Sequence, residues 1–256
     1  LALLGAATLH LTLSSDKPLG FVVARLCDVA PDGSSSRIAH GMLNLCHRDS
    51  FETPAQMVPG QKAEVTVTLD QMACRLAPGH HLRLALSNSY WPFVWPSPEA
   101  GRLTVTSGSL TLPVHPGVDA DEWLPPEAEA AAEWRHKRHS QAKSTRRTET
   151  DLLTGAVSLV VSEDSGRVEN LDHGLITHEA MTERWTVHPD HPETARASCT
   201  WDQRFARGAW SVRTQASADM WADGPDLIMR AQLQAWEGET EIFSRIFQHA
   251  VPRLFV

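Results

Sequence analysis

Three aromatic residues near the middle of the chain are the best candidates for contact with a ligand. Trp91, Phe93 and Trp95 are spaced by two in a segment whose prolines, Pro92 and Pro96, prevent it from continuing a central strand. If the segment is extended, the three rings face the same way and can stack on a sugar or close an apolar pocket. The alternative is that they fill the end of a core or a seam between domains, which is the commoner place for large aromatic side chains.

Histidine is the next residue type that could carry chemistry, since the chain contains 13. The tightest groups are His188 with His191, His136 with His139, and the adjacent His80 and His81. Neighbouring residues of a strand point to opposite faces, so the adjacent pair could not share an ion, and the first pair brackets a proline turn. No loop is dense enough in acidic residues for calcium. We therefore expect no metal and no cofactor.

No motif for nucleophilic catalysis or nucleotide binding occurs in the sequence, which has no G-x-S-x-G elbow, phosphate loop or dinucleotide fingerprint. We expect no catalytic residue in this chain. The net charge is −8, and the excess of acids lies after Thr148, where there are 17 acidic and 9 basic residues. Such a surface repels a duplex or an anionic membrane, so we expect neither nucleic acid nor membrane as a partner.

The four cysteines have no C-x-x-C spacing, and three of them lie in strand-like runs where a thiol packs as a small hydrophobe. Free thiols are therefore favoured over a disulfide, as is usual in the cytoplasm, where we expect this protein to be located. The first nine residues contain neither an initiator methionine nor a basic region. They are typical of neither a signal peptide nor a membrane span, and we expect the chain to be part of a longer protein.

The elements that must position the aromatic segment are short strands. Apolar and polar residues alternate with a period of two in seven runs between Thr8 and Val114, and proline-glycine turns separate several of them. The expected strands are around Leu9–Leu13 and at Phe21–Val29, Arg37–Cys46, Ala63–Leu69, Leu82–Ser87, Leu103–Thr106 and Leu110–Val114. This spacing predicts an all-β domain over residues 1–117, a β-sandwich or jelly roll.

The composition changes in residues 118–147, which we interpret as a linker. Pro125–Arg138 has proline and acids at its front and bases at its back, a pattern that suits either a short helix or a solvated segment. Six acids balance six bases between Val118 and Arg147, which favours a linker over a nucleic-acid patch.

Longer alternating runs resume in residues 148–256 and predict a second domain, an antiparallel β meander. The expected strands are Ala156–Val161, Ile176–Val187, Ala195–Phe205, Trp210–Met220, Leu227–Trp236 and Ile242–His249. Glycine-containing turns such as Arg207-Gly208 and Glu237-Gly238 separate them.

Three ordered motifs resemble a known family. The runs Leu26–Gly33, Gly41–Ser50 and Gly79–Leu84, the last followed by Trp91-Pro92, are similar to the galactose-binding-like jelly-roll domain that ends X-Pro dipeptidyl-peptidases and cocaine esterases, a family of serine hydrolases. The resemblance covers residues 5 to about 115. The later residues resemble, more weakly, the extra β module of bacterial acyl hydrolases. The opening strands expected before Gly5 in such a jelly roll are not in the sequence.

The resemblance implies a non-catalytic chain. In this family an upstream α/β-hydrolase domain carries the catalytic triad, and the jelly roll packs against it, helps to wall the active-site cleft and supports oligomers. We therefore expect the upstream hydrolase domain as a partner, and a homo-oligomer as a further expectation. The alternative is a free-standing carbohydrate-binding module in which Trp91 and Trp95 form the stacking platform, because galactose-binding jelly rolls share this architecture.

Overall fold

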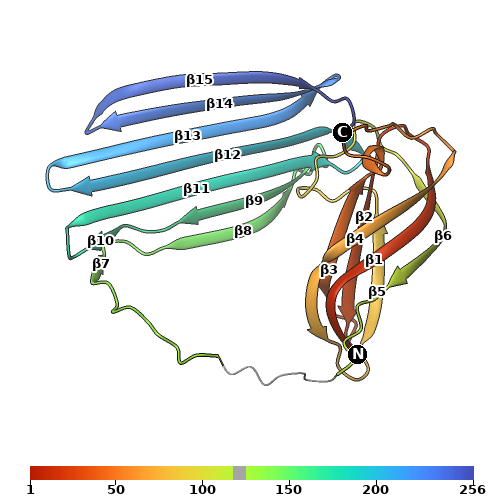
Figure 1. Cartoon of the computed structure of the whole chain (residues 1–256). Coiled ribbons are helices and arrows are strands. Elements are labelled where there is room, and N and C mark those ends of the chain that lie inside the picture. The colour runs from red at the N-terminus through yellow and green to blue at the C-terminus, as the bar shows by residue number, and fades with distance from the viewer. Residues whose placement is uncertain (118–124) are drawn as a thin grey trace. The chain divides into compact units, whose positions relative to one another are not determined.

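The computed structural model describes residues 1–117 and 125–256. The chain forms two compact units, Leu1–Pro125 with Phe255–Val256, and Pro126–Leu254. Both consist of antiparallel β-sheets, and the described residues contain no α-helix (Figure 1). The expected all-β fold class is confirmed.

The first unit is a sandwich of two three-stranded sheets with the strand orders β4-β1-β6 and β3-β2-β5. Its elements are β1 (Ala2–Ser15), β2 (Phe21–Val29), β3 (Ser35–Asn44), the 3₁₀ turn η1 (Leu45–His47), β4 (Lys62–Arg75), β5 (His81–Ser87) and β6 (Leu103–Thr111). The strand expected at Phe21–Val29 has the observed bounds, and β3 and β5 agree with the expected strands to within two residues. β1 begins seven residues before the expected Leu9, and β4 ends six residues after the expected Leu69.

Alternation along the strands builds the core of this unit. Leu9, Leu11 and Leu13 of β1 are buried, whereas His10 on the same strand is exposed. Together with apolar residues of β2 and β4, these leucines form the one hydrophobic core cluster found among the described residues. The core therefore lies between the two sheets, as period-two patterning requires.

The two strands expected at Leu103–Thr106 and Leu110–Val114 are one strand, β6, and this corrects the sequence interpretation. The polar run between them continues the pairing with β1, with Gly108 opposite Leu11. A Cβ atom at Gly108 would lie 2.6 Å from Leu11 Cδ2 and 2.8 Å from the carbonyl oxygen of His10. Glycine is needed there for close approach rather than for a turn.

The range 118–147, expected to be a linker, contains two strands. Residues 126–135 form no helix and are exposed, but β7 (His136–Arg138) and β8 (Lys143–Thr150) both belong to the sheet of the second unit. The helix considered for Pro125–Arg138 is thus absent from its described residues. Residues 118–124 of the same range lie outside the described part of the chain.

The second unit is a single nine-stranded sheet. Its other strands are β9 (Val157–Asp164), β10 (Val168–Asn170), β11 (Leu175–His188), β12 (His191–Arg207), β13 (Trp210–Asp223), β14 (Asp226–Glu237) and β15 (Thr240–Pro252). Strands β11 to β15 are neighbours in chain order, the expected meander, as Figure 1 shows. Each of the last three hairpins has a two-residue loop that begins with glycine, at a φ of 58°, 56° or 57°. A type II′ turn requires glycine at this first loop position.

Within the second unit, all nine strands belong to this one sheet, so the unit contains no second sheet. None of its residues belongs to the core cluster of the first unit. No helix in the described ranges is long and apolar enough to cross a membrane.

Candidate functional site

The aromatic segment follows β5 and is folded into a turn. The amide of Val94 donates to the carbonyl oxygen of Tyr90 at 3.0 Å, so the chain turns back within four residues. Asn88 Nδ2 donates to the carbonyl oxygen of Gly101 at 2.5 Å and ties the two ends of the segment together. Because the backbone is not extended, the three predicted rings do not share one face.

Phe93 belongs to the first of two ring groups. Its ring stacks on Tyr90 with centroids 4.9 Å apart, and 59% of Phe93 is exposed. The guanidinium of Arg37 lies 5.6 Å from the Phe93 ring centroid, and Arg25 lies 5.3 Å from that of Tyr90. Arg37 also donates to the hydroxyl of Tyr90. His40 approaches both rings edge-on at 5.9 Å.

Strands β2 and β3 present the cationic side chains of this group. Arg25 is paired with His40 across the two strands, so both side chains leave the same face of the sheet. Inward-facing neighbours such as Ala24 and Leu26 are buried in the core. The result is an exposed Phe93 ring beside Arg37, stacked on a Tyr90 ring that Arg25 approaches, and aromatic and arginine side chains are enriched at protein interfaces. Sequence reasoning missed Arg25, Arg37, His40 and Tyr90, although two arginines within apolar strands were a visible signal.

Trp91 and Trp95 form the second group. Their rings meet at 85° with centroids 5.1 Å apart. Both indole Nε1 atoms and the hydroxyl of Ser97 are buried without a hydrogen-bond partner among the described residues. A buried donor left without an acceptor costs about 1–3 kcal/mol, so these three groups lower the stability of the segment.

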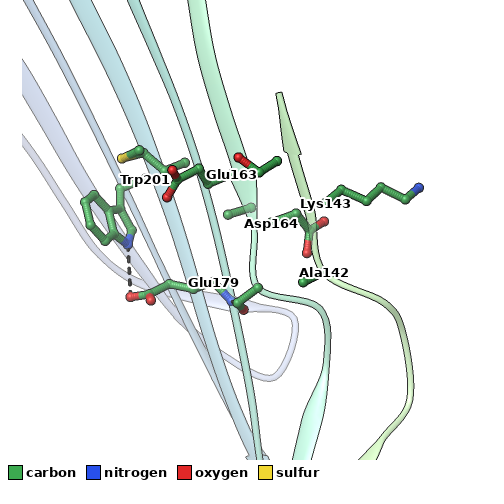
Figure 2. A pocket seen from close by; sticks show the side chains of 10 residues that line it. Ala142, Lys143, Glu163, Asp164, Glu179 and Trp201 are labelled. Carbon is green, nitrogen blue, oxygen red and sulfur yellow. Dashed lines mark hydrogen bonds between the residues drawn. The ribbon is translucent and has the colours of Figure 1, made fainter. Parts of the chain in front are cut away.

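The second unit carries a shallow pocket of about 520 Å³ between β8, β9, β11 and β12 (Figure 2). Trp201 Nε1 donates to Glu179 Oε1 at 3.2 Å, and Gln203 Nε2 donates to the same oxygen at 2.5 Å. Glu163 lines the pocket beside them. These contacts hold the Trp201 ring and a carboxylate on the same face of the sheet.

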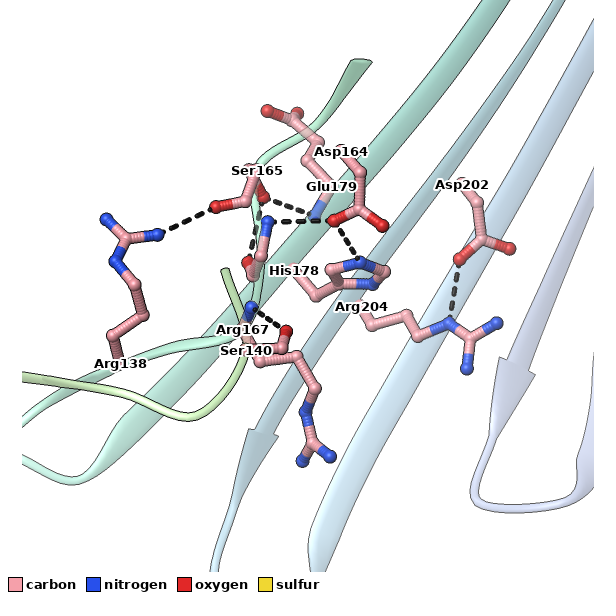
Figure 3. Close-up of polar contacts among 10 residues, drawn as sticks. Arg138, Ser140, Asp164, Ser165, Arg167, His178, Glu179, Asp202 and Arg204 are labelled. Atoms are coloured by element: carbon pink, nitrogen blue, oxygen red, sulfur yellow. Dashed lines mark hydrogen bonds and ion pairs between the residues drawn. The ribbon is translucent and has the colours of Figure 1, made fainter. Parts of the chain in front are cut away.

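Polar contacts around the β9–β10 turn tie loops together (Figure 3). The backbone amide of Gly166 donates to Asp164 Oδ1 at 2.8 Å, and His178 Nε2 lies 3.0 Å from the same oxygen. The amide contact first, and His178 second, hold the pKa of the Asp164 carboxyl below its ordinary value. Arg138 Nη1 donates to the carbonyl oxygen of Ser165 at 3.1 Å. We interpret this network as structural.

A second carboxylate, that of Asp202 on β12, is held by two arginines. Arg204 Nε and Arg213 Nε each donate to Asp202 at 2.7 Å. Burial opposes ionisation of Asp202, but the two arginines outweigh it and keep its pKa below the ordinary value.

The histidine groups do not come together as a metal site. Among the described residues, no cluster of three or more His, Cys, Asp or Glu side chains could hold an ion. His80 instead lies 2.8 Å from Asp28, and the rings of His188 and His191 contact each other at the β11–β12 turn.

Comparisons with known proteins agree with the fold. The sequence profile of the X-Pro dipeptidyl-peptidase C-terminal non-catalytic domain matches residues 1–149. No curated protein matches the chain.

Two solved structures are similar over parts of the chain. An alpha-amino acid ester hydrolase labelled with selenomethionine is 20% identical over 44% of this chain and 23% of its own, with a TM-score of 0.43. An aminopeptidase from the marine sediment archaeon Thaumarchaeota archaeon is 21% identical over 38% of this chain and 17% of its own, with a TM-score of 0.37. The matched part thus spans less than a quarter of either structure.

Proposed function

Because the chain belongs to the family of X-Pro dipeptidyl-peptidase C-terminal non-catalytic domains, we propose that it docks on the α/β-hydrolase domain of a serine hydrolase and shapes substrate access there. The parent enzyme would be of the X-Pro dipeptidyl-peptidase or cocaine-esterase type, with a cytoplasmic location. The observation that carries the docking role is the exposed Phe93 ring with the Arg37 guanidinium beside it.

The aromatic segment has the chemistry of a docking surface. Its exposed Phe93 ring supplies apolar area, Arg37 supplies a cation beside that ring, and Arg25 supplies one beside the neighbouring Tyr90. Aromatic and arginine side chains dominate the energetics of most protein interfaces. A hydrolase surface that offers carboxylate oxygens would pair with the guanidinium group of Arg37.

The same geometry disfavours the carbohydrate-binding alternative. A sugar stacks on a flat exposed ring, whereas Trp91 and Trp95 meet almost at right angles. A glycan array tests this directly, and micromolar binding of a simple sugar that is lost in Trp95→Ala would support the alternative.

The proposal is tested with the chain and its upstream hydrolase domain as separate proteins. We expect the chain alone to turn over neither Xaa-Pro anilides nor small acyl esters. We expect it to bind the hydrolase domain in a calorimetric titration and to alter that domain's KM. Turnover by the chain alone, abolished by a serine-directed inhibitor, would contradict the non-catalytic role.

A matched pair of variants locates the docking surface. Phe93→Ala should weaken binding of the hydrolase domain by about tenfold or more without lowering the melting temperature, because the ring is mostly exposed. Phe51→Ala is the control, since Phe51 is 80% exposed in the same unit but outside the aromatic segment. Equal binding by both variants would show that docking uses another surface.

A further inference from the structure

The two faces of the second unit's sheet differ sharply in chemistry. Residues paired across antiparallel strands share a face, so each row of pairs across β11–β15 can be assigned to one side. One row consists of Trp185, Ala197, Met220, Met229 and His249. The next row, on the other face, consists of Arg184, Ser198, Asp219, Arg230 and Gln248. We call these the apolar face and the polar face.

Large exposed apolar side chains of β11–β15 lie almost entirely on the apolar face. They are Trp201, Phe205, Trp210, Met229, Phe243, Phe247 and Val251, and each is at least 37% exposed. On the polar face the corresponding residue is Ile246, and Ile242 lies at the bulge in β15. Trp221 and Trp236 also lie on the polar face, but they are half-buried and Arg196 and Arg213 lie over their rings. A sheet whose exposed large apolar side chains gather on one face is typical of a face that packs against another layer.

No such layer exists within the second unit, because all of its strands are in the one sheet. An apolar groove of about 470 Å³ runs along the face, lined by Trp185, Met220, Met229 and Phe247 among others. Apolar surfaces of this extent mark interaction sites in stable proteins.

The charges of the apolar face on either side of β13 indicate which partner covers it. Glu179 and Glu183 lie on β11, beyond which the sheet continues into β9 and β10, and Arg245 lies on the edge strand β15. The row that ends in Arg245 begins at Met181, midway between the two glutamates. A surface that is acidic on one side of β13 and basic on the other is complementary to itself when turned about β13.

We propose that two copies of this chain pack through their apolar faces, related by a twofold axis that runs along β13. This axis lays β15 of each copy over β11 of the other and keeps the rows aligned. Arg245 of one copy then lies over Met181 of the other, between Glu179 and Glu183. Small residues on the central strand, Ala216 and Ala218, let the two sheets approach to the usual distance of about 10 Å.

The area of the apolar face is sufficient for a stable dimer. Adjacent strands are about 4.8 Å apart, so five strands span about 24 Å, and roughly twelve paired residues at about 3.4 Å each span about 40 Å. One face therefore covers about 1,000 Å², and two copies would bury about 2,000 Å² together. A standard stable interface buries about 1,600 Å².

The first experiment measures the molar mass of the full chain by sedimentation over a range of concentrations. We expect a dimer of the 28.2 kDa chain at micromolar concentration. Phe247→Glu should be monomeric, because a carboxylate in the covered face has no partner. Ile246→Glu, one residue along on the polar face, should remain dimeric. A monomeric wild type, or equal dissociation by both variants, would overturn the proposal.

A charge exchange tests the arrangement of the two copies. Glu183→Arg and Arg245→Glu should each weaken the dimer by about tenfold, and the double variant should recover most of the loss. A double variant as weak as the singles would refute the proposed axis. The chain alone could instead be monomeric, with Phe247→Glu abolishing its binding to the hydrolase domain. That result would show that the apolar face binds the hydrolase domain, and it would refute the dimer. The hydrolase-docking proposal is tested separately, by the binding of the Phe93→Ala variant to the hydrolase domain.

Discussion

Gly41 on β3 allows a sharp test of how the two sheets of the first unit pack. It is paired with Ala24 within its sheet and faces β4 of the other sheet. A Cβ atom built on Gly41 would lie 2.5 Å from the carbonyl oxygen of Thr68, 3.0 Å from Val67 Cγ1 and 3.1 Å from the Cα of Leu69. We predict that Gly41→Ala destabilises this unit strongly.

The magnitude follows from these contacts. The carbonyl oxygen belongs to the backbone of β4, and Val67 and Leu69 are buried, so no flexible side chain can move aside. Relief requires the sheets to separate by nearly 1 Å, which forfeits a quarter to a half of the local dispersion energy. Overpacking typically costs about 1–3 kcal/mol, and we expect the upper end of that range. At about 4 °C per kcal/mol, the melting temperature falls by about 12 °C.

Gly20→Ala is the matched control in the same unit. Its Cβ would lie 3.7 Å from Leu45 Cδ1, an ordinary contact, and its φ is not positive. We expect no loss of stability there, and a gain of up to about 1 kcal/mol from the less flexible unfolded chain. Hydrogen exchange followed peptide by peptide separates the first unit from the second. Equal protection of β3 and β4 in both variants would refute the reasoning.

Two further predictions concern single polar groups. Asp202→Asn should destabilise the second unit by about 1–2 kcal/mol at pH 7, because Arg204 and Arg213 are directly opposite each other and lose their shared counter-ion. Since the pKa of Asp202 is lowered in the folded state, its stabilisation is present above its ordinary pKa of about 3.9 and is lost as the pH falls through the folded value. Urea unfolding at pH 7 and pH 3 checks this, and a difference between variant and wild type that is as large at pH 3 as at pH 7 would contradict it. Ser97→Ala should leave the isolated chain as stable as the wild type or about 1 kcal/mol more so, because it removes a buried hydroxyl without a partner. Thermal unfolding checks this, and a clear loss of melting temperature would contradict it.

Local sequence patterns were sufficient for most of the strands. Phe21–Val29 and the five long strands of the meander were predicted because alternation and glycine turns act over a few residues. Short strands were missed where the pattern is polar throughout, as in β8, whose side chains are nearly all exposed. The division of β6 into two expected strands, Leu103–Thr106 and Leu110–Val114, was wrong. Gly108 between them allows close contact with β1, a partner nearly 100 residues away in sequence.

The sequence by itself determined that the chain is all-β, which of its residues alternate, and which family its first part belongs to. Only the tertiary structure decided that Phe93 lies with Tyr90 and two arginines while Trp91 and Trp95 pair separately, because a turn redirects their side chains. It also decided that the second unit's apolar face is uncovered. Alternation states which residues share a face, but whether another layer packs on that face depends on contacts that no local pattern encodes.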